Sequence, residues 1–384
     1  MDSLTQVVFG GAVGSAARGP KLGRSAALWG AVAGTVPDLD ILAYPFLDPA
    51  GELIHHRGIT HGLVFAFVAG PLLGWLVWRL RLWRGSTREG ETWRDWATVF
   101  FWGLFTHPLL DVFTIYGTQL LAPFSDHMYA VGSLFIIDLA VTVPLAIGLG
   151  VGLWRQRLSR TAALVGIGVA SLYIGAGVAM QSHARSTVET ALEMRGAEPE
   201  RLLVAAGPLS SLVWRGVVLE DSLITPLSLH LTDPPEAVRF DPPVPLATLP
   251  PGFAESRNGR TLLWFSHGWL ADASGDSLYV SPADGDPPFH VADVRFGRGG
   301  LDPTDAWVFR WRVESEAPFA FSQVERVPSF EEGEFGRLWR WILGRREPPA
   351  DAASAPDAAP ARGPDPASGA DVDSARTLSP DPSP

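Results

Sequence analysis

The pattern of apolar and polar positions divides the chain into two parts. Between residues 25 and 180 long apolar segments alternate with short polar or basic ones, whereas charged residues become frequent after residue 187. Residues 161–180 are twenty residues without a charge, which is the length that a membrane-spanning helix needs. Three further segments are apolar and long enough to predict spans, at residues 62–78, 96–124 and 131–154. Residues 25–36 are shorter and end at Pro37, which predicts a partial or re-entrant span.

Basic residues indicate which ends of these spans face the cytoplasm. The short connections at residues 79–94 and 155–160 are rich in arginine, and Lys21 and Arg24 precede the first partial span. Short basic loops stay on the cytoplasmic side of a membrane. We therefore expect the opposite ends of the spans, and everything after residue 180, on the extracytoplasmic side.

The sequence pattern of the second part of the chain predicts a small β-rich domain. Short apolar runs between Pro, Gly and Asp predict strands at residues 211–219, 262–269, 289–296 and 307–313. Residues 334–346 mix large apolar side chains with arginines, which is typical either of an amphipathic helix on a membrane surface or of a final packing helix. Residues 347–384 are rich in Pro, Ala, Asp and Ser without an apolar pattern, so we expect them to be disordered.

The expected fold class is an α-helical membrane domain followed by a small β-rich soluble domain and a disordered tail. Its predicted boundaries are residues 1–183, 184–346 and 347–384. The start of the chain does not resemble a cleavable signal peptide, because Asp2 takes the place of a basic region and the first apolar stretch is short.

The amino-acid composition limits which metal ligands and which partners the protein can have. The chain has no cysteine, so disulfides and thiolate metal ligands are excluded and any metal must be held by His, Asp or Glu. The net charge of -11, which comes largely from the C-terminal half, argues against nucleic acid as a partner.

Ionisable residues interrupt the apolar half at three places. Such residues at membrane depth are costly and are functional candidates by default. In chain order they are Asp38 and Asp40; His55, His56, Arg57 and His61; and His107 and Asp111.

The spacing within each group limits what it can do. His107 and Asp111 are four apart, on one face of a helix, which suits a shared divalent ion or a hydrogen-bonded pair between packed helices. A turn at Gly58 can bring His56 and His61 together, although two interfacial histidines beside lipid headgroups would show the same pattern.

Asp38 and Asp40 are two apart and in an extended segment would face opposite ways. We therefore expect one ligand between them, with Asp40 favoured as the ligand. Asp38 is then its structural partner, or the general base of a hydrolytic reaction.

The predicted metal ligands are thus Asp40, His56, His61, His107 and Asp111. A set of nitrogen and oxygen ligands suits a divalent metal, and the imidazoles favour zinc. Such an ion lowers the pKa of bound water and polarises an ester or phosphoryl oxygen.

Two further side chains have open roles. Arg57 either clamps an anionic group of the substrate or meets lipid phosphates without a catalytic role. Asp138, in the predicted span 131–154, is a further ligand, an acceptor for a histidine, or a contact between helices.

Five ordered motifs resemble the YdjM/YbcI-type family of bacterial membrane-bound metal-dependent hydrolases. They are MDSLTQ (1–6), WGAVAGTVPDLD (29–40), HRGITH (56–61), THPLLD (106–111) and YGTQLLAPFS (116–125). The resemblance is dense over residues 1–180 and continues more thinly through WRGVV (214–218), WFSHG (264–268), DVRFG (293–297) and FRWRV (309–313).

The resemblance implies a multi-pass protein of the bacterial inner membrane with a metal-dependent hydrolase site, whose substrate is a lipid or small-molecule ester or phosphoester near the bilayer. Some family members have histidine where this chain has Gln6, which puts the number of metal ions in question. The spacing of His107 and Asp111 is also loosely similar to helical multi-zinc phospholipases and nucleases.

A second hypothesis is a non-enzymatic membrane scaffold or regulator, in which the His and Asp clusters lock helices together. A transporter is disfavoured, because the motifs gather at one edge of the spans and no inverted repeat is visible.

Overall fold

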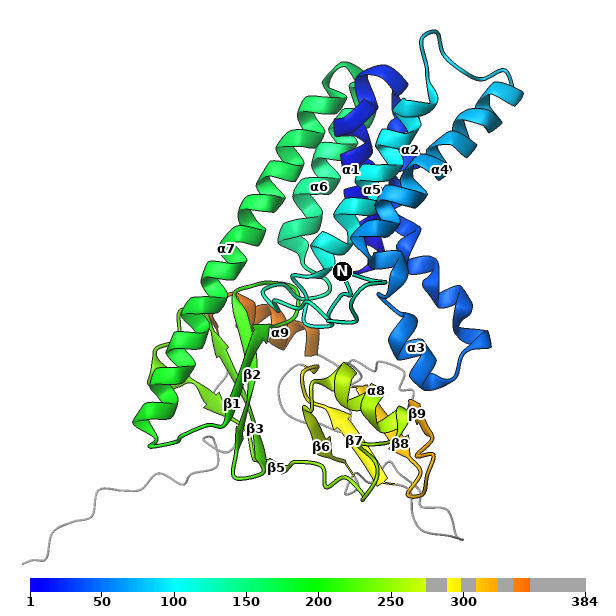
Figure 1. Cartoon of the computed structure of the whole chain (residues 1–384). Helices are drawn as coiled ribbons and strands as arrows, with labels where there is room; N and C mark the ends of the chain where they lie inside the picture. The colour runs from blue at the N-terminus through cyan, green and yellow to red at the C-terminus, as the bar shows by residue number, and fades with distance from the viewer. Residues whose placement is uncertain (274–288, 298–308, 324–333, 346–384) are drawn as a thin grey trace, which may run out of the picture. The chain divides into compact units, whose positions relative to one another are not determined.

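A helical part precedes an antiparallel β-rich part, as the sequence predicts (Figure 1). The computed structural model describes residues 1–273, 289–297, 309–323 and 334–345. These residues belong to one compact unit, Met1–Arg345. The tail that is predicted to be disordered, residues 347–384, lies outside the described residues.

Long helices lie side by side in the first part of the chain (Figure 1). The α-helices are α1 (Ser3–Leu22), α2 (Arg24–Thr35), α3 (Pro49–His55), α4 (Leu63–Trp83), α5 (Trp93–Asp111), α6 (Leu139–Trp154) and α7 (Ser159–Met194). Short 3-10 helices connect them at η1 (Pro37–Phe46), η2 (Ile59–His61) and η3 (Gln156–Leu158). α3 lies apart from the bundle at its lower end in Figure 1.

Local signals fix where several of these helices begin. The Asp2 side chain accepts a hydrogen bond from the backbone N–H of Thr5 and so caps α1. Thr92 and Asp95 form a reciprocal capping box at the start of α5. Asp138 caps α6 in the same way as Asp2 caps α1, through the N–H of Ala140.

Glycines allow α1 and α2 to pack with their backbones almost in contact. A Cβ atom added to Gly30 would lie 2.4 Å from the carbonyl oxygen of Gly10, and one added to Gly14 would lie 2.2 Å from the carbonyl oxygen of Ala26. Both distances are far below van der Waals contact, so these positions have room only for glycine. The two helices therefore form a rigid hairpin, from whose end η1 leaves.

Two helices in the described part of the chain are long and apolar enough to cross a membrane, α4 and the continuous helical segment Gln156–Met194. The bent pair α2 and η1 adds a third span if it is counted as one, with a bend of 41°. α6 is apolar but shorter. The predicted segment 96–124 is helical only to Asp111, where α5 ends.

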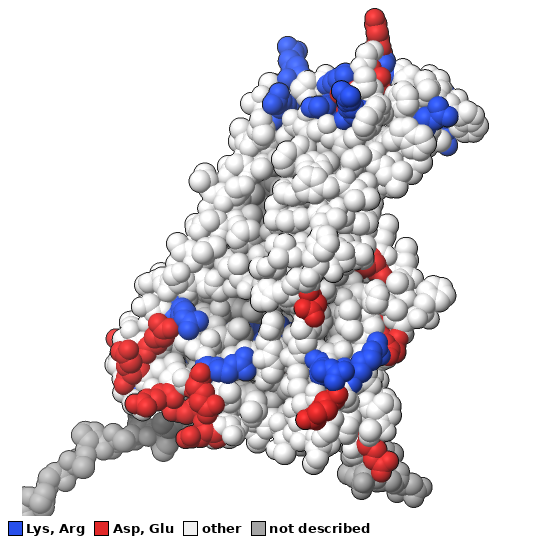
Figure 2. Space-filling model, in the orientation of Figure 1, with Lys and Arg blue, Asp and Glu red and all other residues white. Residues whose placement is uncertain are grey.

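The middle of the helical bundle has few charged residues on the face that Figure 2 shows. Lysines and arginines gather at the end where α1 meets α2 and where α4 meets α5, and acidic residues gather toward the β-rich part (Figure 2). Between these ends the visible surface carries few Lys, Arg, Asp or Glu residues. A surface of this kind is what a hydrocarbon core requires of the side chains that face it.

Helix α7 extends beyond the bundle and supports the first sheet. Its 36 residues are about 54 Å long at 1.5 Å per residue, whereas the hydrocarbon core is about 30 Å thick. The C-terminal turns of α7 place Ala184 and Val188 in one core with Trp214 and Leu227 of the sheet. The helix runs through the predicted domain boundary at residue 183 without a break.

The β-rich part contains two antiparallel sheets. The first has the order β1-β2-β3-β4, with β5 also paired to β3. The second has the order β6-β7-β8-β9. The strands are β1 (Arg201–Ala206), β2 (Val213–Glu220), β3 (Leu223–His230), β4 (Arg239–Phe240), β5 (Val244–Pro245), β6 (Leu270–Asp272), β7 (Phe289–Asp293), β8 (Phe309–Val313) and β9 (Phe321–Gln323).

The strand predicted at residues 262–269 is wrong, because most of this segment belongs to helix α8 (Arg257–Ser266). The Ser256 side chain caps the helix, and His267 ends it in the left-handed conformation. The buried Leu262 and Phe265 are three apart, which is the spacing of a helix face. Strands do occupy the other three predicted positions, as parts of β2, β7 and β8.

A shared hydrophobic core joins the second sheet to the helical part. Ala50 and Leu53 of α3 pack in one cluster with Phe265 of α8 and Trp311 of β8. An exposed ion pair between Asp48 and Arg257 lies beside this core. The segment predicted as an amphipathic or packing helix forms α9 (Glu334–Ile342).

Candidate metal centre

Four predicted site residues meet at the end of the bundle opposite the arginine-rich connections: Asp38 of η1, His61 of η2, and His107 and Asp111 of α5. The chain changes direction after α2, and η1 begins at Pro37. Asp38, the second residue of η1, lies next to the end of α5. Gly58 and Gly62 flank η2, and each has backbone atoms within 3 Å of where a Cβ would be. The chain can therefore fold tightly enough to place His61 next to His107.

One atom from each side chain points to a common centre. The Nε2 atoms of His61 and His107 are 3.1 Å apart. Asp38 Oδ1 lies 3.5 Å from the Nε2 of His61 and 3.4 Å from that of His107. Asp111 Oδ2 lies 3.5 Å and 3.4 Å from the same two nitrogens. All four atoms lie within 4.8 Å of one another.

Most of these separations match a tetrahedral metal site. Ligand atoms about 2.0–2.1 Å from a tetrahedral zinc ion lie about 3.3–3.4 Å from each other. The five separations above fall between 3.1 and 3.5 Å, and the two carboxylate oxygens lie within 4.8 Å of each other. The two imidazole nitrogens, with either carboxylate oxygen, thus have the spacing that one small divalent ion requires.

The hydrogen bonds of the rings indicate which nitrogen carries the proton. His107 Nδ1 donates to the carbonyl oxygen of Gly34, at 2.6 Å. His61 Nδ1 lies 3.1 Å from the Thr60 hydroxyl and 3.7 Å from an Asp40 oxygen. In the neutral rings both Nε2 atoms then turn a lone pair inward, and partners of this kind orient metal-binding histidines. A cation at the centre satisfies all four inward-facing atoms at once.

Asp111 is held from several sides, yet one of its oxygens has no hydrogen bond. Its Oδ1 accepts from the Gln6 amide at 3.0 Å and pairs with the amino group of Met1. Its Oδ2, which faces the centre, is buried and has no hydrogen-bond donor in the described part of the chain. A buried carboxylate oxygen without a partner is costly, and a bound ion would remove that cost.

The centre is buried except at Asp38. The side chains of His61 and His107 are 0% exposed and that of Asp111 is 1% exposed, whereas Asp38 is 21% exposed. Burial lowers the pKa of His61 to about 4, so its ring is neutral at pH 7, the form that binds metals. Access to the centre is therefore from the Asp38 side.

Asp40 and His56 lie beside the centre rather than in it. Asp40 accepts hydrogen bonds from His56 Nδ1 at 3.2 Å and from the backbone N–H of Arg57 at 3.0 Å. The His56 ring is 6.3 Å from the His61 ring. The sequence-based expectation had Asp40 as the ligand and Asp38 as its partner, and the geometry places these two residues the other way round.

Arg57 adds a buried positive charge next to the cluster. It has a φ of +54°, a conformation that is rare outside glycine. Its Nη1 donates to the Thr114 hydroxyl, and its Nε lies 3.7 Å from Asp111 Oδ2. The guanidinium also lies over the ring of Tyr116, 4.7 Å from its centroid. Arg57 is thus fixed at the edge of the centre, as an anion-binding role requires.

Asp138 does not join the cluster. It accepts hydrogen bonds from Ala140 N–H at the start of α6 and from the Tyr173 hydroxyl of α7. The same hydroxyl accepts from the backbone N–H of Ser211, which precedes β2. Asp138 therefore links two helices to the first sheet.

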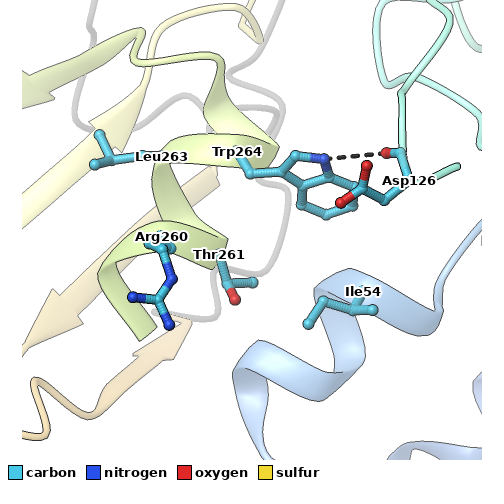
Figure 3. Close-up of a pocket in the computed structure, with 6 residues that line it drawn as sticks. All are labelled: Ile54, Asp126, Arg260, Thr261, Leu263 and Trp264. Carbon is cyan, nitrogen blue, oxygen red and sulfur yellow. Dashed lines mark hydrogen bonds between the residues drawn. The ribbon is translucent and has the colours of Figure 1, made fainter. Parts of the chain in front are cut away.

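A separate pocket of about 480 Å³ lies between α3 and α8 (Figure 3). Its lining is Ile54, Asp126, Arg260, Thr261, Leu263 and Trp264. The Trp264 indole N–H donates to the Asp126 carbonyl oxygen across one side of it (Figure 3). None of the four clustered residues lines this pocket, so it is distinct from the metal centre.

Sequence reasoning missed several groups that hold the centre in place. The Gly34 carbonyl and the Thr60 hydroxyl orient the two histidines, and Gln6 orients Asp111. Gln6 had a signal, since it stands in the first family-like motif. A backbone carbonyl such as that of Gly34 carries no signal in a sequence.

Comparison with known proteins identifies the helical part. Residues 1–184 match the family described as YdjM inner membrane protein, which confirms the predicted resemblance to that family over this segment but not the hydrolase activity that the resemblance implies. The chain is also 38% identical over 102 residues to the inner membrane protein YbcI of Escherichia coli strain K12, which covers 26% of this chain and 54% of the relative. The chain thus spans about half the length of that relative. No solved structure matches.

These matches agree with the candidate spans of the structure. Together they support a location in the inner membrane.

Proposed function

We propose that the protein is a metal-dependent hydrolase that cleaves an ester or phosphoester bond at the surface of the inner membrane. The observation that carries this proposal is the convergence of two imidazole nitrogens and two carboxylate oxygens within 4.8 Å of one another, one of them the Oδ2 of Asp111, which accepts no hydrogen bond. A purely structural cluster gains nothing from leaving that oxygen without a donor.

The ligand set favours zinc. Zinc is bound by histidine nitrogens and carboxylate oxygens in tetrahedral sites, whereas magnesium and calcium prefer six or more oxygen ligands. When bound, the ion would supply Lewis-acid chemistry that polarises a carbonyl or phosphoryl oxygen.

The side chains around the centre have distinct proposed roles. Asp38, the exposed ligand, lies where a substrate must approach. Arg57 binds the anionic part of the substrate and neutralises charge that develops on it. His56 is held at Nδ1 by Asp40, which leaves Nε2 on the opposite side of its ring to take up or give a proton.

The position of the centre favours a substrate at the bilayer surface. Leu63, the first residue of the span α4, is two residues after His61. Large apolar side chains near the centre are exposed, with Phe46 at the end of η1 86% exposed and Phe124 83% exposed. The Phe124 loop lies next to η2, since the Leu120 carbonyl oxygen accepts from Leu63 N–H. Exposed aromatic rings of this kind suit the lipid–water boundary.

The same arrangement supports a multi-pass topology with the metal centre and the β-rich part outside the cytoplasm. The arginine-rich connections gather at the other end of the bundle (Figure 2), and short basic connections stay in the cytoplasm. The substrate would then be presented from the outer leaflet of the inner membrane.

A structural role for the cluster is the second candidate. Asp111 pairs with Met1 and receives the Gln6 amide, so it also holds α1 against α5. In that case the same residues would serve a scaffold without a bound ion.

Metal analysis of the purified protein separates the two functions. Wild type in detergent, treated with EDTA and reloaded with zinc, should retain about one ion per chain, because the described residues form one such cluster. His61→Ala and Asp111→Ala should lose most of it, because each removes one ligand. His55→Ala is the matched control, since His55 is exposed and bonds only to its own helix in the described residues. Zinc-dependent cleavage of bis(p-nitrophenyl) phosphate should follow metal content across the four proteins.

A bound ion also stabilises the fold that binds it. Zinc should therefore raise the Tm of EDTA-treated wild type and of His55→Ala, but not of Asp111→Ala. Wild type that retains no divalent metal and whose Tm does not respond to zinc would show that the cluster is structural.

A further inference from the structure

Helix α9 exposes a continuous apolar stripe. Phe335 and Trp339 of α9 and Leu343, the residue after its end, follow one another at intervals of four residues. The Leu343 N–H still donates to the Trp339 carbonyl oxygen, so the three residues lie on one side of the helix. They are 60%, 44% and 56% exposed. Three large apolar side chains on one exposed face are more than the scattered single residues that a surface normally carries.

The stripe borders the face by which α9 packs onto the protein, but its three side chains stay exposed. Ile342 is buried at 7% exposure, and its carbonyl oxygen lies 3.3 Å from Nε2 of His230 at the end of β3. Leu338 and Trp341 are half-buried on the same side of the helix. Packing therefore accounts for one part of the apolar surface of α9 and leaves the stripe uncovered.

A chain of contacts places α9 near the base of the membrane helices. His230 is followed by Leu231, whose N–H donates to the carbonyl oxygen of Leu212. The preceding residue, Ser211, donates to the hydroxyl of Tyr173 in α7, which bonds to the cap of α6. α9 crosses the direction of these helices rather than continuing it (Figure 1).

The charge of α9 also matches a bilayer surface. Arg337 and Arg340 are exposed on the part of the helix away from the stripe, and Arg345 follows its end. Apolar and aromatic residues on one side with arginines on the other are the composition of helices that lie in the interface of anionic membranes.

We propose that α9 is an interfacial membrane helix, whose Phe335–Trp339–Leu343 stripe sits among the lipid headgroups of the leaflet that α6 and α7 enter. The lipid surface is favoured over a protein partner because the stripe is apolar and aromatic while arginines lie on another side of the same helix. The β-rich part would thereby be held against the membrane at a fixed height. This inference does not depend on the metal centre.

The absence of cysteine from the sequence makes a direct test available. Trp339→Cys and Arg337→Cys each create a single labelling site, and the two positions point about 160° apart on a helix with 3.6 residues per turn. Each full-length variant is labelled with an environment-sensitive NBD fluorophore and reconstituted into nanodiscs of phosphatidylethanolamine and phosphatidylglycerol. Quenching is then measured with iodide in the buffer and with lipids that carry a doxyl group near the headgroup.

The label at position 339 should be quenched by the doxyl lipids and be several-fold less sensitive to iodide than the label at position 337. Phe335→Cys and Leu343→Cys should repeat the pattern of position 339, which guards against one substitution that disturbs the helix. Equal iodide quenching at 337 and 339 would overturn the proposal in favour of a water-exposed stripe. Shielding of position 339 from both quenchers would overturn it in favour of a protein contact.

Discussion

At the scale of single residues, the centre depends on how its two histidines are held. The Nδ1 of His107 donates to the Gly34 carbonyl oxygen, and the Nδ1 of His61 lies within hydrogen-bond distance of the Thr60 hydroxyl, so the Nε2 of each ring faces the centre. Asp38 and Asp111 complete the set from opposite sides of the pair. The arrangement assigns different tasks to Asp38 and Asp40, although only one residue separates them.

This difference is measurable in metal affinity. Asp38→Ala removes a ligand, whereas Asp40→Ala removes an acceptor for His56 and a weak one for His61. Loss of such an outer partner costs about 10–100-fold in metal affinity, so Asp40→Ala should fall in that range and Asp38→Ala should lose more. Competition with a zinc-selective chelator measures both. A greater loss in Asp40→Ala than in Asp38→Ala would restore the assignment expected from the sequence.

Asp138 gives a prediction for pH. Burial raises its pKa to about 6, whereas an unfolded aspartate has a pKa of about 3.9. The folded state therefore binds more protons between these values, and the stabilising effect of the neutral carboxyl is lost as the pH rises through 6. The loss should reach about 1–3 kcal/mol at pH 7.5.

Asp138→Asn should remove this dependence, because asparagine is uncharged and still caps a helix. The test compares the Tm of variant and wild type at pH 5 and pH 7.5 in detergent, and the wild type should fall further. Asp221→Asn, at an exposed turn with a φ of +49° that asparagine tolerates, is the control. An identical fall in all three proteins would show that Asp138 does not titrate in this range.

At the scale of elements, the α1–α2 hairpin sets the position of the centre. The backbones of Gly30 and Gly34 contact α1, and the carbonyl oxygen of Gly34 accepts a hydrogen bond from His107 Nδ1. Glycine is therefore needed here for close approach of two backbones, and the site is built directly on that contact.

Gly30→Ala should destabilise the protein by about 1–3 kcal/mol, the usual effect of an added methylene in a packed interior. Its Cβ would meet the Gly10 carbonyl, which is backbone and cannot turn aside. Gly168→Ala in α7 is the matched control, since a Cβ there meets nothing within 4 Å. Thermal unfolding in detergent should separate the two, and equal Tm values would mean that the hairpin can open without cost.

The helical elements were predictable because apolar length alone distinguishes a span from other structure. Each of the five predicted apolar segments contains helix, but α5 ends at Asp111 and α6 begins only at Leu139, so segments 96–124 and 131–154 are helical in part. The segment 262–269 was mistaken for a strand because a short apolar run has no clear period, and the Ser256 cap that begins α8 lies outside it. Likewise, spacing could separate Asp38 from Asp40 but not choose between them, because the choice depends on how η1 turns after Pro37.

At the scale of the whole molecule, charge is arranged along the bundle. The charged residues of the helical connections at one end are mainly basic, whereas basic and acidic residues are mixed at the end of the β-rich part (Figure 2). The proposed orientation, with the centre outside the cytoplasm, follows from the position of these charges.

Single cysteines test this orientation. Glu255→Cys, before α8, should react in intact spheroplasts with a maleimide that cannot cross the membrane. Glu89→Cys, in the connection between α4 and α5, should react only after lysis. Both side chains are exposed, so accessibility alone does not separate them. The reverse pattern would place the metal centre on the cytoplasmic side.

The order of the centre's residues along the chain has a consequence for biosynthesis. The four clustered residues, and the groups of Gln6, Gly34, Arg57 and Thr60 that hold them, all precede residue 112. A ribosome that has finished α5 has therefore already supplied every one of these groups, while α6, α7 and both sheets are still untranslated. Metal binding at the proposed centre would then hold the first two helical hairpins together in the nascent chain while later segments are still being made.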